Sequence, residues 1–160
     1  MKRKDKVNYY LDIAETVLAR STCIRRKYGA IIVQNDEIIA TGYNGAPRGR
    51  KNCIDLEHCL RDELGIPSGE RYELCRSVHA ESNAIISAAR QNMIGATLYL
   101  AGRNGKTGDI LNDTSPCTMC RRLIINAGII KTVCRIGEDE YVEINVREWI
   151  YGDDSLSIKP

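Results

Sequence analysis

Two short motifs constrain the fold of this chain more than any other feature of its sequence. His79-Ala80-Glu81 opens one stretch of helical pattern, and Pro116-Cys117-Thr118-Met119-Cys120 opens another. One imidazole and two thiols are three ligands of the kind that zinc prefers, and they leave a fourth tetrahedral position free, as in catalytic zinc sites. Both motifs can bind one ion only if the fold brings the two helix starts together.

The cysteine count and the charge balance narrow the class of protein. Seven cysteines in 160 residues cannot all pair within the chain, because the number is odd. The charged N-terminal stretch does not continue into the apolar region of a signal peptide, so we expect a cytoplasmic protein whose cysteines serve metal binding or catalysis. No apolar run approaches the roughly 18 residues of a membrane helix. With 23 Lys and Arg against 21 Asp and Glu, a polynucleotide partner is not expected either.

Hydrophobic periodicity predicts an α/β domain. Apolar spacing and composition predict helices over residues 7–20, 79–90 and 117–126, and strands over 29–34, 37–42, 96–101, 130–135 and 141–146. Asn35-Asp36 predicts a hairpin between the first two strands. Alternating strands and helices favour a layered fold with a mixed sheet whose later strands are parallel. No repeat or linker divides the chain, so we predict a single domain over residues 1–160.

Residues 43–70 contain several glycines and prolines and predict a loop region, with a short helix near residues 56–64. Structureless loops in compact domains seldom exceed about 12–15 residues, so something must order this segment. A bound metal ion is one candidate.

Glu81 fits a chemical role beside the metal better than a ligand role. It lies two residues from His79, about 200° around an ideal helix, so the two side chains need not point the same way. A carboxylate beside a zinc-bound water acts as a general acid and base. The alternative is a purely structural zinc site formed by Cys117 and Cys120 with other cysteines, with His79 only capping a helix.

The pattern His-x-Glu followed by Pro-Cys-x-x-Cys is the known signature of zinc-dependent nucleobase deaminases. Three further segments resemble the deoxycytidylate (dCMP) deaminase family: residues 21–30 (STCIRRKYGA), 42–47 (GYNGAP) and 124–128 (IINAG). The GYNG segment is the discriminating one, because tRNA adenosine, cytidine, guanine and riboflavin-pathway deaminases share the zinc motif. The resemblance implies a three-layer cytidine-deaminase-like fold, with a five-stranded mixed sheet and helices on both faces.

The resemblance also implies a reaction, the hydrolysis of dCMP to dUMP and ammonia for thymidylate synthesis. Zn²⁺ bound by His79, Cys117 and Cys120 would activate water for attack on C4, and Glu81 would carry protons to N3 and to the leaving amine. Arg26 is our candidate for the 5′-phosphate, since a planar guanidinium binds phosphate bidentately. The remaining candidate substrate contacts are Ser21, Asn44, the backbone of Ala80 and Ser115, and Tyr141. Alternatively, Asn44 is only a turn residue and Tyr141 only a strand residue.

Four cysteines fall around the long loop, namely Cys23, Cys53, Cys59 and Cys75, with His58 nearby. Some dCMP deaminases hold a second, structural zinc with ligands from these regions, and the resemblance implies the same here. Free buried cysteines are the alternative. Cys134, in a predicted strand, is a candidate core residue. Family resemblance further implies a homo-oligomer, a hexamer or a dimer, activated by dCTP and inhibited by dTTP.

The chain departs from the family pattern in one place. Residues 102–114 stand between a predicted strand and the Pro-Cys motif, where the more familiar members run almost directly from one to the other. This segment either closes over the substrate or is an inert surface loop. Two other functions therefore stay open: the same chemistry on CMP, cytidine or a tRNA base, and a non-catalytic zinc-stabilised binding protein.

Overall fold

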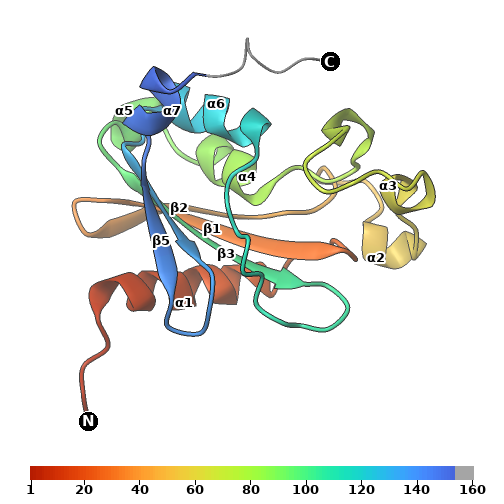
Figure 1. Cartoon of the computed structure of the whole chain (residues 1–160), viewed down its shortest axis with the longest axis horizontal. Helices are drawn as coiled ribbons and strands as arrows, with labels where there is room; N and C mark the ends of the chain where they lie inside the picture. Colours follow the sequence, from red (N-terminus) through yellow and green to blue (C-terminus); the bar gives the residue numbers. More distant parts are fainter. Residues whose placement is uncertain (154–160) are drawn as a thin grey trace.

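A five-stranded mixed sheet forms the centre of the computed structural model, which describes residues 1–153 (Figure 1). In spatial order, the strands are β2 (Glu37–Tyr43), β1 (Arg26–Gln34), β3 (Thr97–Asn104), β4 (Lys131–Arg135) and β5 (Tyr141–Asn145). Only β3 and β4 pair in parallel. The five-stranded mixed sheet is confirmed. Residues 154–160 of the predicted domain lie outside the described residues.

The prediction that the later strands are all parallel is wrong for β5. A short connection at residues 136–140 joins β4 to β5, and the Ile136 amide donates to the Glu140 carbonyl at 2.9 Å. A parallel partner would need a crossover of a dozen or more residues, so this tight turn forces β5 to run antiparallel to β4.

Helices cover both faces of the sheet, as expected (Figure 1). On one face lies α1 (Lys6–Leu18), and on the other lie α4 (Ala80–Ile86), α5 (Arg90–Met93), α6 (Thr118–Ala127) and α7 (Arg147–Tyr151). The short helices α2 (Cys53–Leu56) and α3 (Leu60–Glu63) and the 3₁₀ turn η1 (Tyr72–Leu74) lie in the long connection between β2 and α4. None of the described helices is long and apolar enough to cross a membrane.

Each helical layer has its own apolar core. Tyr10, Leu11 and Ala14 project from α1 at helical spacing and pack with Ile31 and other sheet residues. The opposite core contains Ala80 and Ala84 of α4 and Ile124 of α6, and Cys134 is buried there as predicted. The His79-Ala80-Glu81 segment and the Pro116–Cys120 segment therefore lie at the edge of a packed core rather than on a free surface loop.

Several element boundaries differ from the sequence prediction. The helix predicted over residues 79–90 ends at Ile86, where the hydroxyl of the following residue, Ser87, donates to the Asn83 carbonyl at 2.8 Å. The long loop holds two short helices instead of one near residues 56–64, because Glu57 adopts a left-handed conformation and ends α2. The short helix α7 was not predicted.

Two glycines on neighbouring strands let both helical layers approach the sheet closely. A Cβ atom on Gly29 would lie 2.1 Å from the Ala14 carbonyl oxygen of α1. A Cβ atom on Gly42 would lie 2.3 Å from the Ala84 amide nitrogen and 2.4 Å from the Ala80 carbonyl oxygen of α4. Backbone atoms cannot move aside as side chains can, so Gly42 fixes the distance between the sheet and the helix that carries Glu81.

We predict that Gly42→Ala lowers the free energy of unfolding by about 2–3 kcal/mol, because the added methyl group overpacks the contact between β2 and α4. Denaturant unfolding would measure the change. Thr41→Ala is the matched control, since the Thr41 side chain is exposed on the same strand, and it should cost less than about 1 kcal/mol. Equal effects of the two substitutions would contradict the role of Gly42.

Candidate active site

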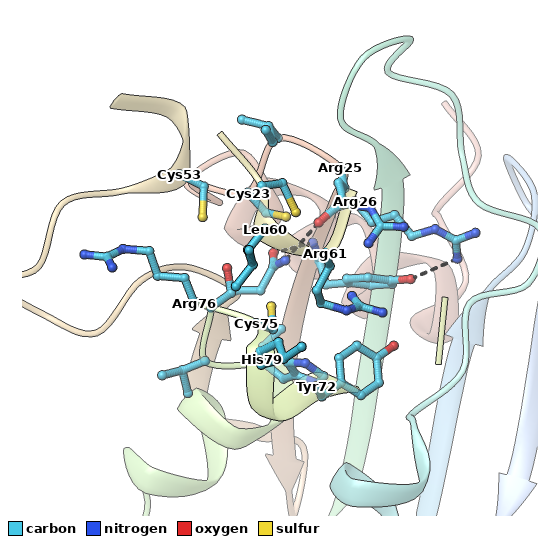
Figure 2. Close-up of a pocket in the computed structure, with 18 of the residues that line it drawn as sticks. Cys23, Arg25, Arg26, Cys53, Leu60, Arg61, Tyr72, Cys75, Arg76 and His79 are labelled. Carbon is cyan, nitrogen blue, oxygen red and sulfur yellow. Dashed lines mark hydrogen bonds between the residues drawn. The ribbon is translucent and has the colours of Figure 1, made fainter. Parts of the chain in front are cut away.

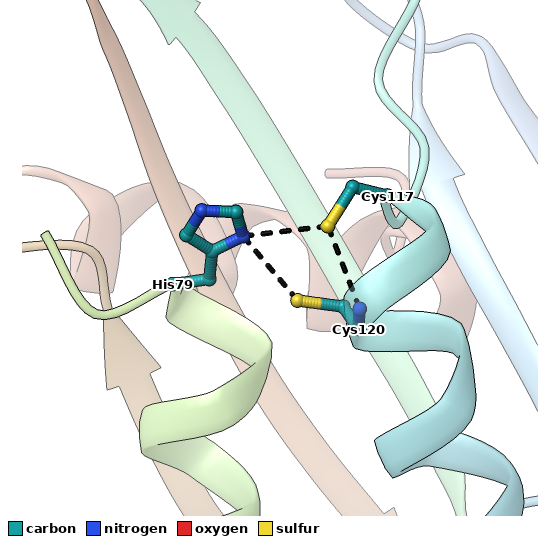
Figure 3. Close-up of side chains that lie close together, drawn as sticks. All are labelled: His79, Cys117 and Cys120. Carbon is teal, nitrogen blue, oxygen red and sulfur yellow. Dashed lines mark hydrogen bonds between the residues drawn. The ribbon is translucent and has the colours of Figure 1, made fainter. Parts of the chain in front are cut away.

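The fold brings the two helix starts together. His79 is the N-cap of α4 and Cys117 is the N-cap of α6, while Cys120 lies in the first turn of α6. The His79 Nδ1 atom is 3.5 Å from the Cys117 Sγ atom and 3.4 Å from the Cys120 Sγ atom (Figure 3). All three donor atoms lie within 4.8 Å of one another, and no other group of three potential metal ligands converges in residues 1–153.

These three residues fit a zinc ion. Tetrahedral zinc, with Zn–S of about 2.3 Å and Zn–N of about 2.0 Å, separates a nitrogen ligand from a sulfur ligand by about 3.5 Å. The two nitrogen–sulfur distances in the structure have this value. The donor set, one imidazole and two thiols on two rigid helix ends, suits zinc and leaves a fourth position.

The thiols and the imidazole are electrostatically coupled. Hydrogen bonding from Cys120 and His79 holds the pKa of Cys117 well below its usual range, and the same interaction raises the pKa of Cys120. Burial alone would lower the pKa of His79, but its hydrogen bonds to Cys117 and Cys75 and the charge of Glu81 raise the pKa to about 10. A metal ion bound here would displace the protons that His79 and Cys120 retain, because only a neutral imidazole and a thiolate act as ligands.

Glu81 is buried beside this cluster. The residue is 5% exposed, and burial raises the pKa of its carboxyl group. Its carboxylate is not one of the converging donors. A raised pKa makes the carboxylate a better proton acceptor, which is what a general base that later acts as an acid requires.

One cavity of about 590 Å³ opens over the cluster (Figure 2). Of the residues that the sequence singles out as substrate contacts, Arg26, Asn44, Ala80 and Ser115 line it, as do Glu81, His79 and Cys117. Ser21 and Tyr141 do not. Tyr141 lies on the edge strand β5, and β3 and β4 separate β5 from β1.

Asn44 is buried in the cavity wall and its side chain binds the backbone of β1. Its Nδ2 atom donates to the Arg26 carbonyl at 2.8 Å, and its Oδ1 atom accepts from the Tyr28 amide at 2.8 Å and from the Ser21 hydroxyl at 2.6 Å. Asn44 does not have a positive φ, so it is not the turn residue that the sequence left open. The Asn44 side chain instead holds the start of β1, whose first residue is Arg26.

Sequence reasoning missed two residues of the cavity wall. The Arg61 guanidinium lies 4.5 Å over the ring of Tyr72, and the centroids of the Tyr72 and His79 rings are 4.6 Å apart in an edge-to-face arrangement (Figure 2). Arg61 is 6% exposed and donates to the carbonyl oxygens of Pro67 and Glu70, each at 2.8 Å. No local motif marks this stack, because it joins α3 and η1, two short elements of one long connection, through tertiary packing alone.

The four loop cysteines also gather at this cavity. Cys23, Cys53, Cys59 and Cys75 all line it, and none forms a disulfide. Burial raises the pKa of Cys53, and negative charge on the other three cysteines raises it further, so the four thiols lie within electrostatic reach of one another. His58 pairs with Glu63.

Comparison with known proteins places these features in a family. The model of the cytidine and deoxycytidylate deaminase zinc-binding region matches residues 4–136. The deoxycytidylate deaminase of Mycobacterium phage D29 is 37% identical over 138 residues, which cover 83% of this chain and 96% of the phage protein. The deoxycytidylate deaminase of Schizosaccharomyces pombe is 33% identical over 126 residues, but the chain spans only 35% of that protein.

A solved structure agrees with the sequence matches. The crystal structure of dCMP deaminase from the cyanophage S-TIM5 superposes with a TM-score of 0.58 at 28% identity, covering 86% of this chain and 88% of the phage chain. The same phage enzyme in complex with dCMP and dUMP gives a TM-score of 0.57. The family model covers most of the chain, including the converging His-Cys-Cys motif, so the chain belongs to the cytidine and deoxycytidylate deaminase zinc-binding family.

Proposed function

We propose that this protein is a zinc-dependent hydrolase that converts dCMP to dUMP and ammonia. The observation that carries the proposal is the convergence of the His79, Cys117 and Cys120 donor atoms beside buried Glu81 at the base of one cavity. The phage relative that shares this fold is solved with dCMP and dUMP bound. Deoxycytidylate deaminases also dominate the sequence relatives described above.

The residues divide the reaction between them. A zinc ion held by His79, Cys117 and Cys120 would supply a Lewis acid that activates water for attack on C4 of the base. Glu81 would accept a proton from this water and transfer it to N3 of the ring, and would then carry the proton of the new C4 hydroxyl to the departing amine. A C–O bond forms at C4, the C–N bond breaks and ammonia departs, while the base stays attached to its sugar as uracil.

Binding groups surround the reacting atoms. The backbone of Ala80, at the first position of α4, and that of Ser115, just before α6, border the cavity and would hydrogen-bond the amide-like edge of the base. Arg26 at the same cavity would hold the 5′-phosphate. Asn44 and Ser21 act through the backbone of Arg26, as their hydrogen bonds indicate.

The substrate proposal predicts ammonia release from dCMP with zinc-loaded protein, and little or none from CMP, deoxycytidine, cytidine or adenosine nucleotides. Each substrate would be assayed with and without dCTP, because activation by dCTP and inhibition by dTTP remain predictions. The homo-oligomer and the cytoplasmic location also remain predictions. Turnover of unphosphorylated nucleosides as fast as dCMP would keep the zinc chemistry and reject the nucleotide substrate.

Glu81→Gln tests the chemical role directly. We predict that this variant keeps its zinc content, while kcat falls by about 10²–10⁴-fold because the amide can neither accept nor deliver the proton. Metal analysis and ammonia release would be measured on the same preparation. Turnover by the variant at the wild-type rate would overturn the acid and base role of Glu81.

We also propose a second, structural zinc ion held by Cys23, Cys53, Cys59 and Cys75, whose sulfur atoms do not converge in the described structure and would draw together around the ion. The four cysteines come from separate loop segments and line one cavity, and Figure 2 labels Cys23, Cys53 and Cys75 among the lining side chains. A closed four-cysteine site would explain how a glycine- and proline-rich connection is ordered, since structural zinc contributes directly to folding free energy.

The second site predicts about two zinc ions per chain in purified protein, as a structural site and a catalytic site together require. Cys53→Ser should lower the content to about one. Cys134→Ser is the matched control, because Cys134 is buried in the sheet core away from this cavity, and should leave the content unchanged. One zinc ion per wild-type chain, measured by plasma emission spectroscopy, would remove the second site.

A further inference from the structure

The segment between β3 and α6 is an ordered part of the wall around Arg26. At its start, the Gly105 amide donates to the Arg25 carbonyl at 2.7 Å, which ties the segment to the strand that carries Arg26. At its end, the Thr114 residue is 4% exposed, and its hydroxyl donates to the Leu111 carbonyl at 3.0 Å. Asp113, between these anchors, is therefore held at a defined place.

Asp113 pairs with the one side chain that we assign to the phosphate. The Nη1 atom of Arg26 lies 3.1 Å and 3.2 Å from the two carboxylate oxygens of Asp113. The Tyr28 hydroxyl is 3.5 Å from the same nitrogen. Neighbouring Arg25 is occupied elsewhere, because its Nε atom pairs with Asp62 at 2.7 Å. Arg26 lines the cavity and Asp113 does not.

The contacts to Asp113 and Tyr28 use one nitrogen of the Arg26 guanidinium and leave the other two free for a ligand. A guanidinium presents its donors in a rigid planar fork, and a phosphate group takes two parallel hydrogen bonds from it. With Nη1 engaged by Asp113 and Tyr28, the Nε and Nη2 atoms remain for a phosphate in the cavity. Asn44 holds the backbone of Arg26, so the residue is fixed at both ends.

We propose that Asp113 is a positioning residue for substrate specificity, which orients Arg26 toward the 5′-phosphate of the nucleotide. The inference rests on the proposed function. The pair is too exposed to matter much for folding, with side-chain exposures of 34% for Arg26 and 56% for Asp113. Its effect is on orientation: it keeps a flexible side chain from sampling the solvent, which lowers the entropic cost of binding the phosphate.

Asp113→Asn tests this proposal. We expect KM for dCMP to rise about threefold to fivefold, the range that loss of one partly exposed ion pair can produce. The value of kcat should stay near wild type, because the phosphate is remote from C4. Asp113→Glu should recover most of the affinity. Asp109→Asn, an exposed aspartate of the same segment that does not pair with Arg26, is the matched control for the change in net charge.

A double-mutant cycle separates positioning from a general effect on the wall. In an Arg26→Gln background, Asp113→Asn should leave KM unchanged, because it acts only through Arg26. An unchanged or lowered KM in the single variant, or an equal rise in the Arg26→Gln background, would overturn the proposal. Absence of dCMP turnover by the wild type would count against the proposed function instead, and binding of dUMP, measured by calorimetry in the same variants, would then decide on Asp113.

Discussion

The meeting of two helix starts is the constraint on which the rest of this structure depends. The His79 imidazole on the N-cap of α4 comes within 3.5 Å of both thiol sulfurs at the start of α6. Unpaired amide groups at helix starts favour negative charge, and the Cys120 amide contacts the Cys117 sulfur, so the backbone that positions Cys117 also favours its thiolate form. The sheet serves this contact: α4 approaches it closely only because β2 presents a glycine to the helix backbone.

The sequence predicts the elements that carry this contact better than those that surround it. The strands of the sheet, the helix α1 and the starts of α4 and α6 follow from local periodicity and from ligand spacing, because those signals act within one element. The direction of β5 was mispredicted because the tight turn at residues 136–140 decides it, and the helix α4 ends at Ile86, short of the predicted end at residue 90. The metal-type donors were found because their chemistry fixes their spacing.

The cavity wall shows what a single sequence cannot reveal. Asn44 was singled out as a direct substrate contact, and the structure places its amide in hydrogen bonds to the backbone around Arg26. The stack of Arg61 on Tyr72, whose ring packs against His79, joins α3 and η1 and has no sequence pattern. Such contacts depend on how the long connection between β2 and α4 folds over the sheet, and this connection has no periodicity to read.

The groups proposed for chemistry and those proposed for substrate recognition lie on different parts of the fold. The groups proposed for chemistry lie on the rigid ends of α4 and α6, whose apolar sides are buried in the core, and small errors in their placement would cost catalytic rate. The groups proposed for recognition lie on the start of β1 and on loops that reach across to it, and an aspartate from the segment before α6 completes them. Changes in those loops can alter the substrate without disturbing the helix starts. A zinc motif therefore indicates the type of reaction, whereas Arg26 and its partners are the groups that we propose to distinguish a nucleotide from an unphosphorylated nucleoside.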